Sequence, residues 1–172
     1  MELGKLRYLL ISFGVMALDQ WTKWLVELHL PHHAAETVIP GFLNLTHVRN
    51  TGVAFGLFAS DGNGTNWTLT ILGLVALTAV GVYFWLAPSK DRWLLAALAL
   101  VVGGAVGNLI DRIASGAVTD FIDVYVGGHH WPSFNVADSA ISMGIVLMAI
   151  DSFRTHRHPD EPHPDEEKPA EA

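Results

Sequence analysis

The residues in this sequence most able to do chemistry are acidic groups that lie inside or directly beside long apolar segments. Asp120 and Asp123 belong to the segment VTDFIDVYVGG, and Asp138 belongs to FNVADSAIS, where the last apolar segment begins. Two carboxylates that meet at low dielectric cannot both ionise easily, so one keeps its proton while the other stays charged. An aspartic protease needs this state, because the charged member activates water and the protonated member hydrogen-bonds the scissile carbonyl.

The same acidic residues also have a structural interpretation. Asp120 could cap a short helix at the membrane interface, and Asp138 could bond backbone groups at the start of the last helix. Acidic residues at membrane depth are functional by default, but they need not be enzymatic. Spacing alone therefore leaves catalysis open, and it does not choose between Asp120 and Asp123.

Two further polar sites interrupt apolar segments. Asp19 and Lys23 are four residues apart, so one helical turn brings them together as a salt bridge that either steadies the helix or takes part in catalysis. Asn108, Asp111 and Arg112 form one polar helix face that must point into the protein, since lipid cannot satisfy it. Asp111 is expected to pair with Arg112 or another basic group, while Asn108 and Arg112 could bind carbonyls or phosphate of a substrate. Glycines that let a neighbouring helix approach closely lie just before or within this face: Gly103, Gly104 and Gly107.

The elements that must position these residues are helices in a membrane. The chain has 172 residues, of which 51% are hydrophobic and only 16% are charged, and its mean hydropathy is +0.34. Four apolar stretches, each of roughly the 20 residues that cross the hydrocarbon of a bilayer, are 8–28, 67–87, 93–113 and 136–153. The sequence therefore predicts an all-α membrane bundle of four transmembrane helices. The short turn 88–92 makes the second and third helices an antiparallel hairpin.

The distribution of Lys and Arg predicts how this bundle is oriented. Most of the basic residues flank one side, and only Arg49 and Arg112 lie on the other. By the positive-inside rule, both termini are expected in the cytoplasm. The connection 29–66 then lies on the outer face, and its alternating stretch 42–49 predicts strands of a small extracytoplasmic β-sheet between helices one and two.

Composition also limits the domain organisation and the chemistry. Residues 1–153 are expected to form one transmembrane domain, followed by a disordered acidic tail at 154–172 in the cytoplasm. Much of the net charge of -7 comes from this tail, so the body is nearly neutral and no nucleic acid partner is expected. The chain has no cysteine, no HExxH pair and no GxSxG elbow, which argues against thiol, zinc-protease and serine-hydrolase chemistry. We expect neither a metal nor a cofactor.

Two other classes of protein must be weighed. A proton-coupled transporter or channel subunit would use Asp111, Asp120 and Asp138 to relay protons or bind an ion. The small size of this chain and the absence of an inverted repeat or of paired broken helices in its sequence count against this class. A non-catalytic membrane scaffold would leave so many intramembrane polar groups unexplained.

Five motifs, in order along the chain, resemble those of lipoprotein signal peptidase, also called signal peptidase II, of bacterial inner membranes. They are DQWTK at 19–23, VRNTGVAFG at 48–56, GNLIDR at 107–112, VTDFIDV at 118–124 and FNVADSAIS at 134–142. The resemblance implies an intramembrane aspartic endopeptidase that cuts the signal peptide from prolipoproteins, just before the cysteine that carries a diacylglyceryl group. It also implies a location in the inner membrane among lipids, with the active site near the outer leaflet. A monomer is expected.

The resemblance further implies roles for individual residues. The catalytic aspartates of the family fall on Asp120 and Asp138, which settles the choice that spacing left open. Positions that line the substrate site and orient the substrate backbone fall on Asn50, Gly52, Asn108, Arg112 and Asn135, with Asp19, Lys23 and Asp111 in supporting roles. This sequence departs from the family pattern at Thr119, where valine is common, and in its acidic tail. Neither departure affects the implied catalytic residues.

Overall fold

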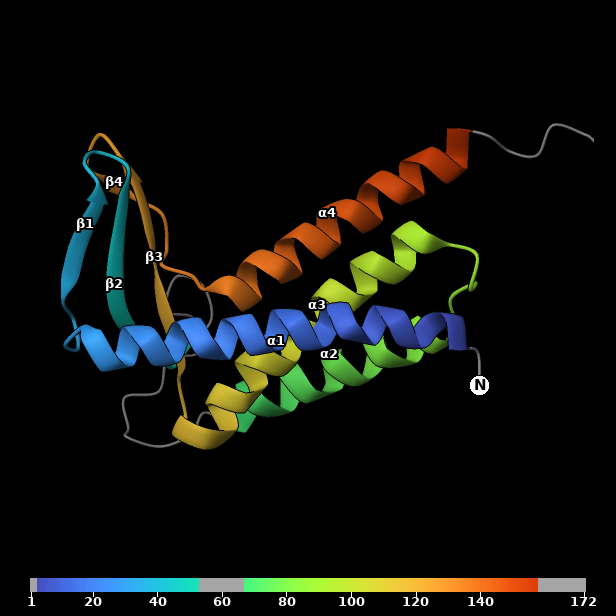
Figure 1. Ribbon diagram of the computed structural model, residues 1–172, viewed down its shortest axis with the longest axis horizontal. Coiled ribbons are helices and arrows are strands. Elements are labelled where there is room, and N and C mark those ends of the chain that lie inside the picture. Colours follow the sequence, from blue (N-terminus) through green and yellow to red (C-terminus); the bar gives the residue numbers. More distant parts are fainter. Residues whose placement is uncertain (1–2, 53–66, 158–172) are drawn as a thin grey trace, which may run out of the picture.

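The structure consists of a helical bundle with a small antiparallel sheet at one end (Figure 1). This computed structural model describes residues 3–52 and 67–157. The elements are α1 (Leu3–His29), β1 (Ala35–Ile39), β2 (Leu43–Asn50), α2 (Trp67–Leu86), α3 (Arg92–Ser115), β3 (Val118–Val126), β4 (His129–His130) and α4 (Val136–Arg157). α1 begins and α4 ends at the end of the bundle opposite the sheet. The predicted tail lies almost wholly outside the described residues, as does the end of the VRNTGVAFG motif.

Within the described residues, three helices are long and apolar enough to cross a membrane, namely α2, α3 and the part Val136–Phe153 of α4. Large apolar side chains such as Val75 of α2 and Val146 of α4 are exposed on them, as lipid-facing surfaces require. α1 has 27 residues, but charged residues such as Asp19 and Lys23 keep it out of this set. The four predicted helices are thus present, and length and composition identify three of them as spans.

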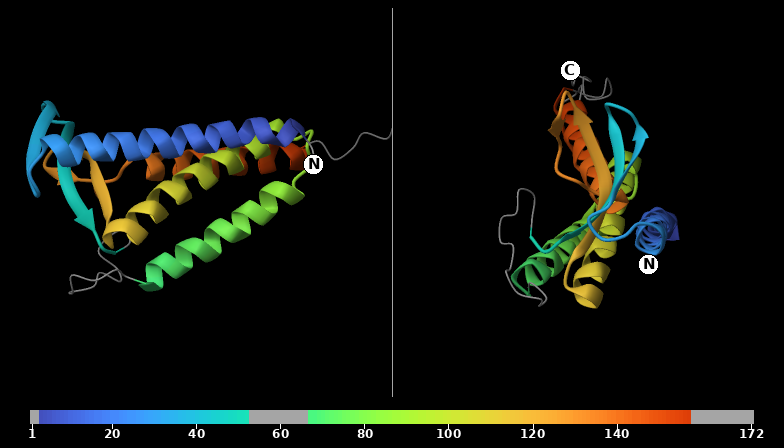
Figure 2. Two further views of the ribbon diagram at one scale, coloured as in Figure 1. Left: turned by 60° about the horizontal axis from the view of Figure 1, so that its bottom comes forward. Right: turned by 90° about the vertical axis from the view of Figure 1, so that its left-hand side faces the viewer.

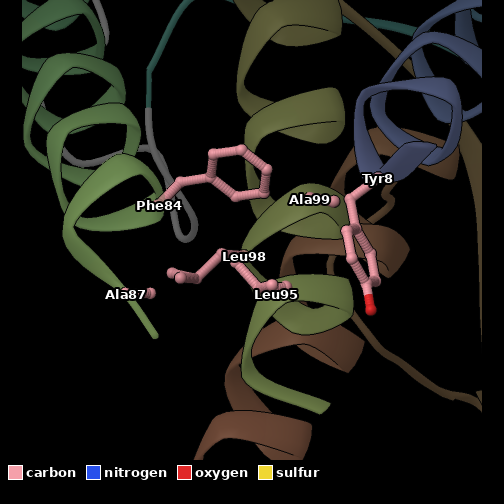
Figure 3. Close-up of a cluster of buried hydrophobic side chains, with 6 residues drawn as sticks. All are labelled: Tyr8, Phe84, Ala87, Leu95, Leu98 and Ala99. Carbon is pink, nitrogen blue, oxygen red and sulfur yellow. The ribbon is translucent and has the colours of Figure 1, made fainter. Parts of the chain in front are cut away.

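The end of the bundle away from the sheet is closed by an apolar cluster from three helices (Figure 3). Its buried members are Tyr8 of α1, Phe84 of α2, Leu95, Leu98 and Ala99 of α3, and Ala87 in the turn between α2 and α3. Beside it, Lys5 donates hydrogen bonds of 2.7 Å to the backbone carbonyls of Trp85 and Ala87, which have no helical partner at the end of α2. Asp91 then starts α3 by accepting from the N–H of Leu94, so α2 and α3 form the predicted hairpin (Figure 2).

Glycines of α3 allow α1 and α4 to pack directly on its backbone. A Cβ atom added at Gly103 would lie 2.6 Å from a backbone oxygen of α1, and one at Gly107 would lie 2.6 Å from Oδ2 of Asp19. Gly104 faces the backbone carbonyl of Ala137 at the start of α4. The close helix approach predicted from these glycines is therefore present, and it brings polar groups of three helices together at the sheet end.

The sheet differs from the prediction in its origin. Its strands follow the order β1-β2-β3-β4, and each neighbouring pair is antiparallel. Only β1 and β2 come from the connection between α1 and α2, whereas β3 and β4 follow α3. Gly116, with φ of 78°, ends α3 in the left-handed conformation, so the chain turns directly into β3. The buried backbone of β3 then takes its hydrogen bonds from β2.

Candidate active site

Asp120 and Asp138 reach the same place from different elements. Asp120 lies in β3, where Val48 of β2 is its partner in the register, so it does not cap a helix as the structural interpretation supposed. Asp138 lies in the first turn of α4, which begins beside the sheet (Figure 1). Both side chains line one cavity of about 830 Å³. The strand fixes one carboxylate and the helix fixes the other.

Asn135 connects the two carboxylates. Its side-chain amide donates a hydrogen bond of 2.8 Å to Oδ1 of Asp120. Its side-chain oxygen accepts from the N–H of Asp138 at 2.9 Å, and Oδ2 of Asp138 accepts from the N–H of Asn135 at 3.3 Å. This reciprocal pair is a capping box, which satisfies free N–H groups at the start of a helix. The expected helix-start role of Asp138 is therefore present, and the same geometry turns its carboxylate toward the cavity.

Two more asparagines donate to these carboxylates. Asn50, at the end of β2, donates a hydrogen bond of 2.9 Å to Oδ2 of Asp120. Its own side-chain oxygen accepts a hydrogen bond of 3.0 Å from the N–H of Gly52. Asn108 of α3 donates 2.7 Å to Oδ1 of Asp138. Each carboxylate oxygen of the pair thus has a donor in the structure.

Its surroundings make the carboxyl group of Asp120 titrate near neutral pH. The side chain is only 2% exposed, and burial raises the pKa of Asp120 to about 7, with the neighbouring Asp138 acting in the same direction. Hydrogen bonds from Asn50 and Asn135 oppose this rise in the pKa without cancelling it. A carboxyl group that titrates near neutrality can donate a proton as readily as accept one.

The residues expected in supporting roles form a buried ionic cluster behind the cavity. Lys23 lies 2.7 Å from Asp19 and 2.7 Å from Asp111, so Asp111 pairs with a residue of another helix and not with Arg112. Asp19 also accepts 2.9 Å from the N–H of Ala137, which ties α1 to the start of α4. The predicted pair Asp19–Lys23 is present, but it is half of a larger network.

The remaining predicted residues lie on the cavity wall or behind it. The wall is formed by residues of β2, α3, β3, the segment after β4 and α4, together with Thr51 and Gly52 just after β2. Its polar side chains include Asn50, Asn108, Arg112, Ser139 and Ser142. Arg112 donates to the backbone oxygen of Asn108 at 3.4 Å, so its guanidinium has further donors available. Asn135 is fully buried beneath the wall.

Asp123 takes no part in this site. It accepts hydrogen bonds of 2.9 Å from Asn44 and 2.8 Å from His130, within the sheet. Burial acts to raise its pKa, but these two hydrogen bonds outweigh it, and the pKa of Asp123 lies below its usual value. Asp120 and Asp123 therefore differ in their surroundings, and their spacing in the sequence could not reveal this difference.

Neither Gln20 nor the wall after β4 was predicted from the sequence. The side-chain amide of Gln20 donates hydrogen bonds of 2.7 Å to Asp111 and 3.2 Å to the backbone oxygen of Gly107. Its place inside the DQWTK motif was the available signal, but a neutral amide draws less notice than a charge. The wall segment contributes Trp131 and Phe134 to the cavity. Within 3–52 and 67–157, no cluster of three or more potential metal ligands occurs.

Comparison with known proteins identifies the family. A family model described as signal peptidase (SPase) II matches residues 11–154. The chain belongs to the signal peptidase II family. A lipoprotein signal peptidase of Acinetobacter baumannii is 47% identical over 83% of this chain and 81% of its own length. One of Maridesulfovibrio salexigens is 44% identical over 84% of this chain and 94% of its own length.

A solved structure described as a bacterial membrane enzyme agrees with the fold. It superposes with a TM-score of 0.78 at 32% identity and covers 91% of this chain and 93% of that chain. As a member of the signal peptidase II family, the chain is a protease of the membrane, and the family resemblance read from its motifs is confirmed.

Proposed function

We propose that this protein is an intramembrane aspartic endopeptidase that removes the signal peptide from diacylglyceryl-modified prolipoproteins, cutting before the lipid-modified cysteine. One observation carries the aspartic mechanism: the carboxylates of Asp120 and Asp138 line the same cavity and are both bonded to Asn135. The names of the relatives support the substrate class.

In this proposal the two carboxylates share one proton. The pKa of Asp120, raised by burial to about 7, supports a protonated carboxyl beside a charged one under neutral conditions. The charged member removes a proton from water, and the protonated member hydrogen-bonds the scissile carbonyl. A substrate anchored by its lipid is confined to the membrane surface, which lowers the entropic cost of bringing peptide and carboxylates together.

The polar wall of the cavity would hold the peptide. Asn50, Gly52, Asn108 and Arg112 line it, and Arg112 offers donors that suit backbone carbonyls. Asn135 would orient the two carboxylates from below. Asp19, Lys23 and Asp111 would hold the helices that carry these groups. No cofactor or metal is required for this mechanism.

The proposed topology has four transmembrane helices, with α1 as the fourth. The charges of α1 near the site are buried and paired, since Lys23 and Asp19 are 3% and 0% exposed and lie 2.7 Å apart. A charge satisfied inside the bundle does not face lipid. Basic residues lie at the end of the bundle opposite the sheet, which supports cytoplasmic termini and an active site near the outer leaflet of the inner membrane. We propose that it acts as a monomer.

Cleavage of a diacylated prolipoprotein by the purified protein in detergent tests the proposal. Asp120→Asn and Asp138→Asn change shape very little, and each should abolish formation of the shortened product. Asp123→Asn is the matched control, because Asp123 lies in the same strand as Asp120 but away from the cavity, and it should cleave normally. Ordinary activity in either of the first two variants, correctly folded, would show that the pair is assigned wrongly. Aspartate-dependent proton flux in vesicles without any cleavage would favour a transporter instead.

A further inference from the structure

The asparagines around the carboxylates are held in defined orientations. An amide side chain has an accepting oxygen and a donating NH2 group, so its orientation decides what it offers to a neighbour. In each of three asparagines the oxygen accepts from a group that can only donate: Gly52 N–H for Asn50 (3.0 Å), Asp138 N–H for Asn135 (2.9 Å) and Lys23 Nζ for Asn108 (3.0 Å). All three NH2 groups are thereby directed at the carboxylates.

Asn108 differs from the other two because its partner is a side chain of another helix. The oxygens of Asn50 and Asn135 are fixed by nearby backbone, whereas that of Asn108 accepts from the ammonium of Lys23 in α1 at 3.0 Å and, at the longer distance of 3.2 Å, from the amide of Asn135. A rotated amide would bring its NH2 group against the ammonium, and donor would face donor. With the oxygen toward Lys23, the NH2 group lies 2.7 Å from Oδ1 of Asp138.

Lys23 is itself held firmly in place. Its side chain is 3% exposed and contacts both Asp19 and Asp111 at 2.7 Å. One amide, that of Asn108, separates its charge from Asp138. The hydrogen-bonded path from Lys23 to Asp120 is longer, because it passes through Asn108 and then Asn135, which lies 3.2 Å from the oxygen of Asn108.

We propose that Lys23 is a positioning residue that fixes the Asn108 amide toward Asp138 and makes Asp138 the ionised member of the pair, with Asp120 holding the proton. This inference rests on the proposed function. Asp138 then takes a proton from water as the water oxygen attacks the scissile carbonyl carbon, and the Asp120 proton passes to the carbonyl oxygen. When the C–N bond breaks, Asp138 gives its proton to the leaving nitrogen, and a hydroxyl of the intermediate returns one to Asp120.

The test compares two buried lysines of the same helix. Among the residues that the structure describes, the charged groups around the pair are Asp19 and Lys23 from α1, Arg49 from β2, and Asp111 and Arg112 from α3, with Asp120 facing Asp138 from β3. In Lys23→Met the ammonium no longer opposes protonation of the pair. We expect kcat to fall about 10²-fold and the acid limb of the pH profile of kcat/KM to move to higher pH by about one unit, with KM little changed.

Lys5→Met is the matched control. Lys5 is also buried in α1, but it bonds carbonyls at the far end of the bundle. Its removal should affect stability and leave the pH profile unchanged. If Lys23→Met does not fold, the double variant Lys23→Met/Asp111→Asn removes both charges of one pair, and its acid limb should move in the same direction by a smaller amount, because loss of the Asp111 charge acts the other way.

A folded Lys23 variant with the acid limb of the wild type, even at a lower rate, would overturn the inference. Equal displacement in Lys5→Met would also overturn it, because the effect would then be structural. Failure of the proposed function is a separate result, since it would appear as activity retained by Asp120→Asn or Asp138→Asn with Lys23 intact.

Discussion

Asn135 donates a side-chain hydrogen bond of 2.8 Å to Asp120 from a residue that also caps α4. One residue therefore has two separable tasks. Its oxygen stabilises the helix that carries Asp138, and its NH2 group is a fixed donor at the other carboxylate. A shorter side chain that can still cap the helix distinguishes the two tasks.

Asn135→Ser should keep the fold and lose most of the activity. Serine caps helices as well as asparagine does, but it cannot extend an NH2 group to Asp120. Loss of one preorganised donor lowers kcat by about 10²-fold. Thermal unfolding and cleavage rates measure the two effects.

The control for this variant is Asn44→Ser. Asn44 also donates to an aspartate, Asp123, at 2.9 Å, but this pair lies within the sheet. Its cleavage rate should stay near that of the wild type. A serine variant at 135 that retains wild-type kcat would contradict the donor role of Asn135.

The cleavage rate should show a bell-shaped dependence on pH. The pKa of Asp120 is raised to about 7, so its proton is lost and the rate falls as the pH rises above about 7. On the acid side the rate falls when the second carboxylate also takes a proton. Measurement of kcat/KM across pH, with chemistry limiting, checks this shape. A rate that stays flat over several pH units would argue against a shared proton.

Asp120→Asn should make the folded protein more stable at neutral and alkaline pH. The folded state keeps a proton on Asp120 up to its pKa of about 7, while the unfolded chain releases it near the ordinary value of 3.8. Between these values the wild type loses stability as the pH rises. The asparagine variant avoids this loss, which amounts to at most about 4 kcal/mol above pH 7.

This gain should narrow as the pH is lowered from about 7 and disappear below 3.8, where the carboxyl is protonated in both states. Asp123→Asn should behave in the opposite way, because the pKa of Asp123 is lowered and its charge stabilises the folded state above the unfolded pKa. Thermal unfolding in detergent at several pH values checks both. An Asp120→Asn variant less stable than the wild type at pH 8 would contradict the burial of an unfavourable charge there.

Gly104→Ala should disturb both stability and activity. A Cβ atom there would meet the backbone oxygen of Ala137 and lie 2.8 Å from Cγ1 of Ile141, so the start of α4 would have to move. Overpacking of this kind costs about 1–3 kcal/mol. Gly81→Ala is the control, since nothing lies within 4 Å of a Cβ atom there. Equal unfolding temperatures for the two variants would show that α4 adapts without cost.

The helices and the Asp19–Lys23 pair could be predicted because their signals are local. Apolar stretches of spanning length end near the observed helix ends, and the spacing of Asp19 and Lys23 shows a shared helix face. The pairing of Lys23 with Asp111 could not be predicted, because α1 and α3 meet only in the folded bundle. The spacing of residues in the sequence predicts contacts within one helix or strand, but it does not predict contacts between elements.

The origin of β3 was missed for the same reason. Its residues are rich in β-branched and aromatic side chains, which favour a strand, but its pairing with β2 joins segments that lie far apart in the chain. The family motifs supplied the positions of Asp120 and Asp138 without their geometry. The orientation of each amide depends on a donor from elsewhere in the chain, so no local pattern contains it.

The two halves of the sheet are separated in the chain by a helical hairpin, and this limits when the site can exist. Asn50 is synthesised before α2, Asp120 only after α3, and Asn135 and Asp138 at the start of the last helix. A ribosome-bound chain that has placed its first three helices in the membrane still lacks one carboxylate and the amide that joins the pair. On the proposed mechanism, cleavage would therefore begin only when α4 docks and adds Asn135 and Asp138 to the rest of the site.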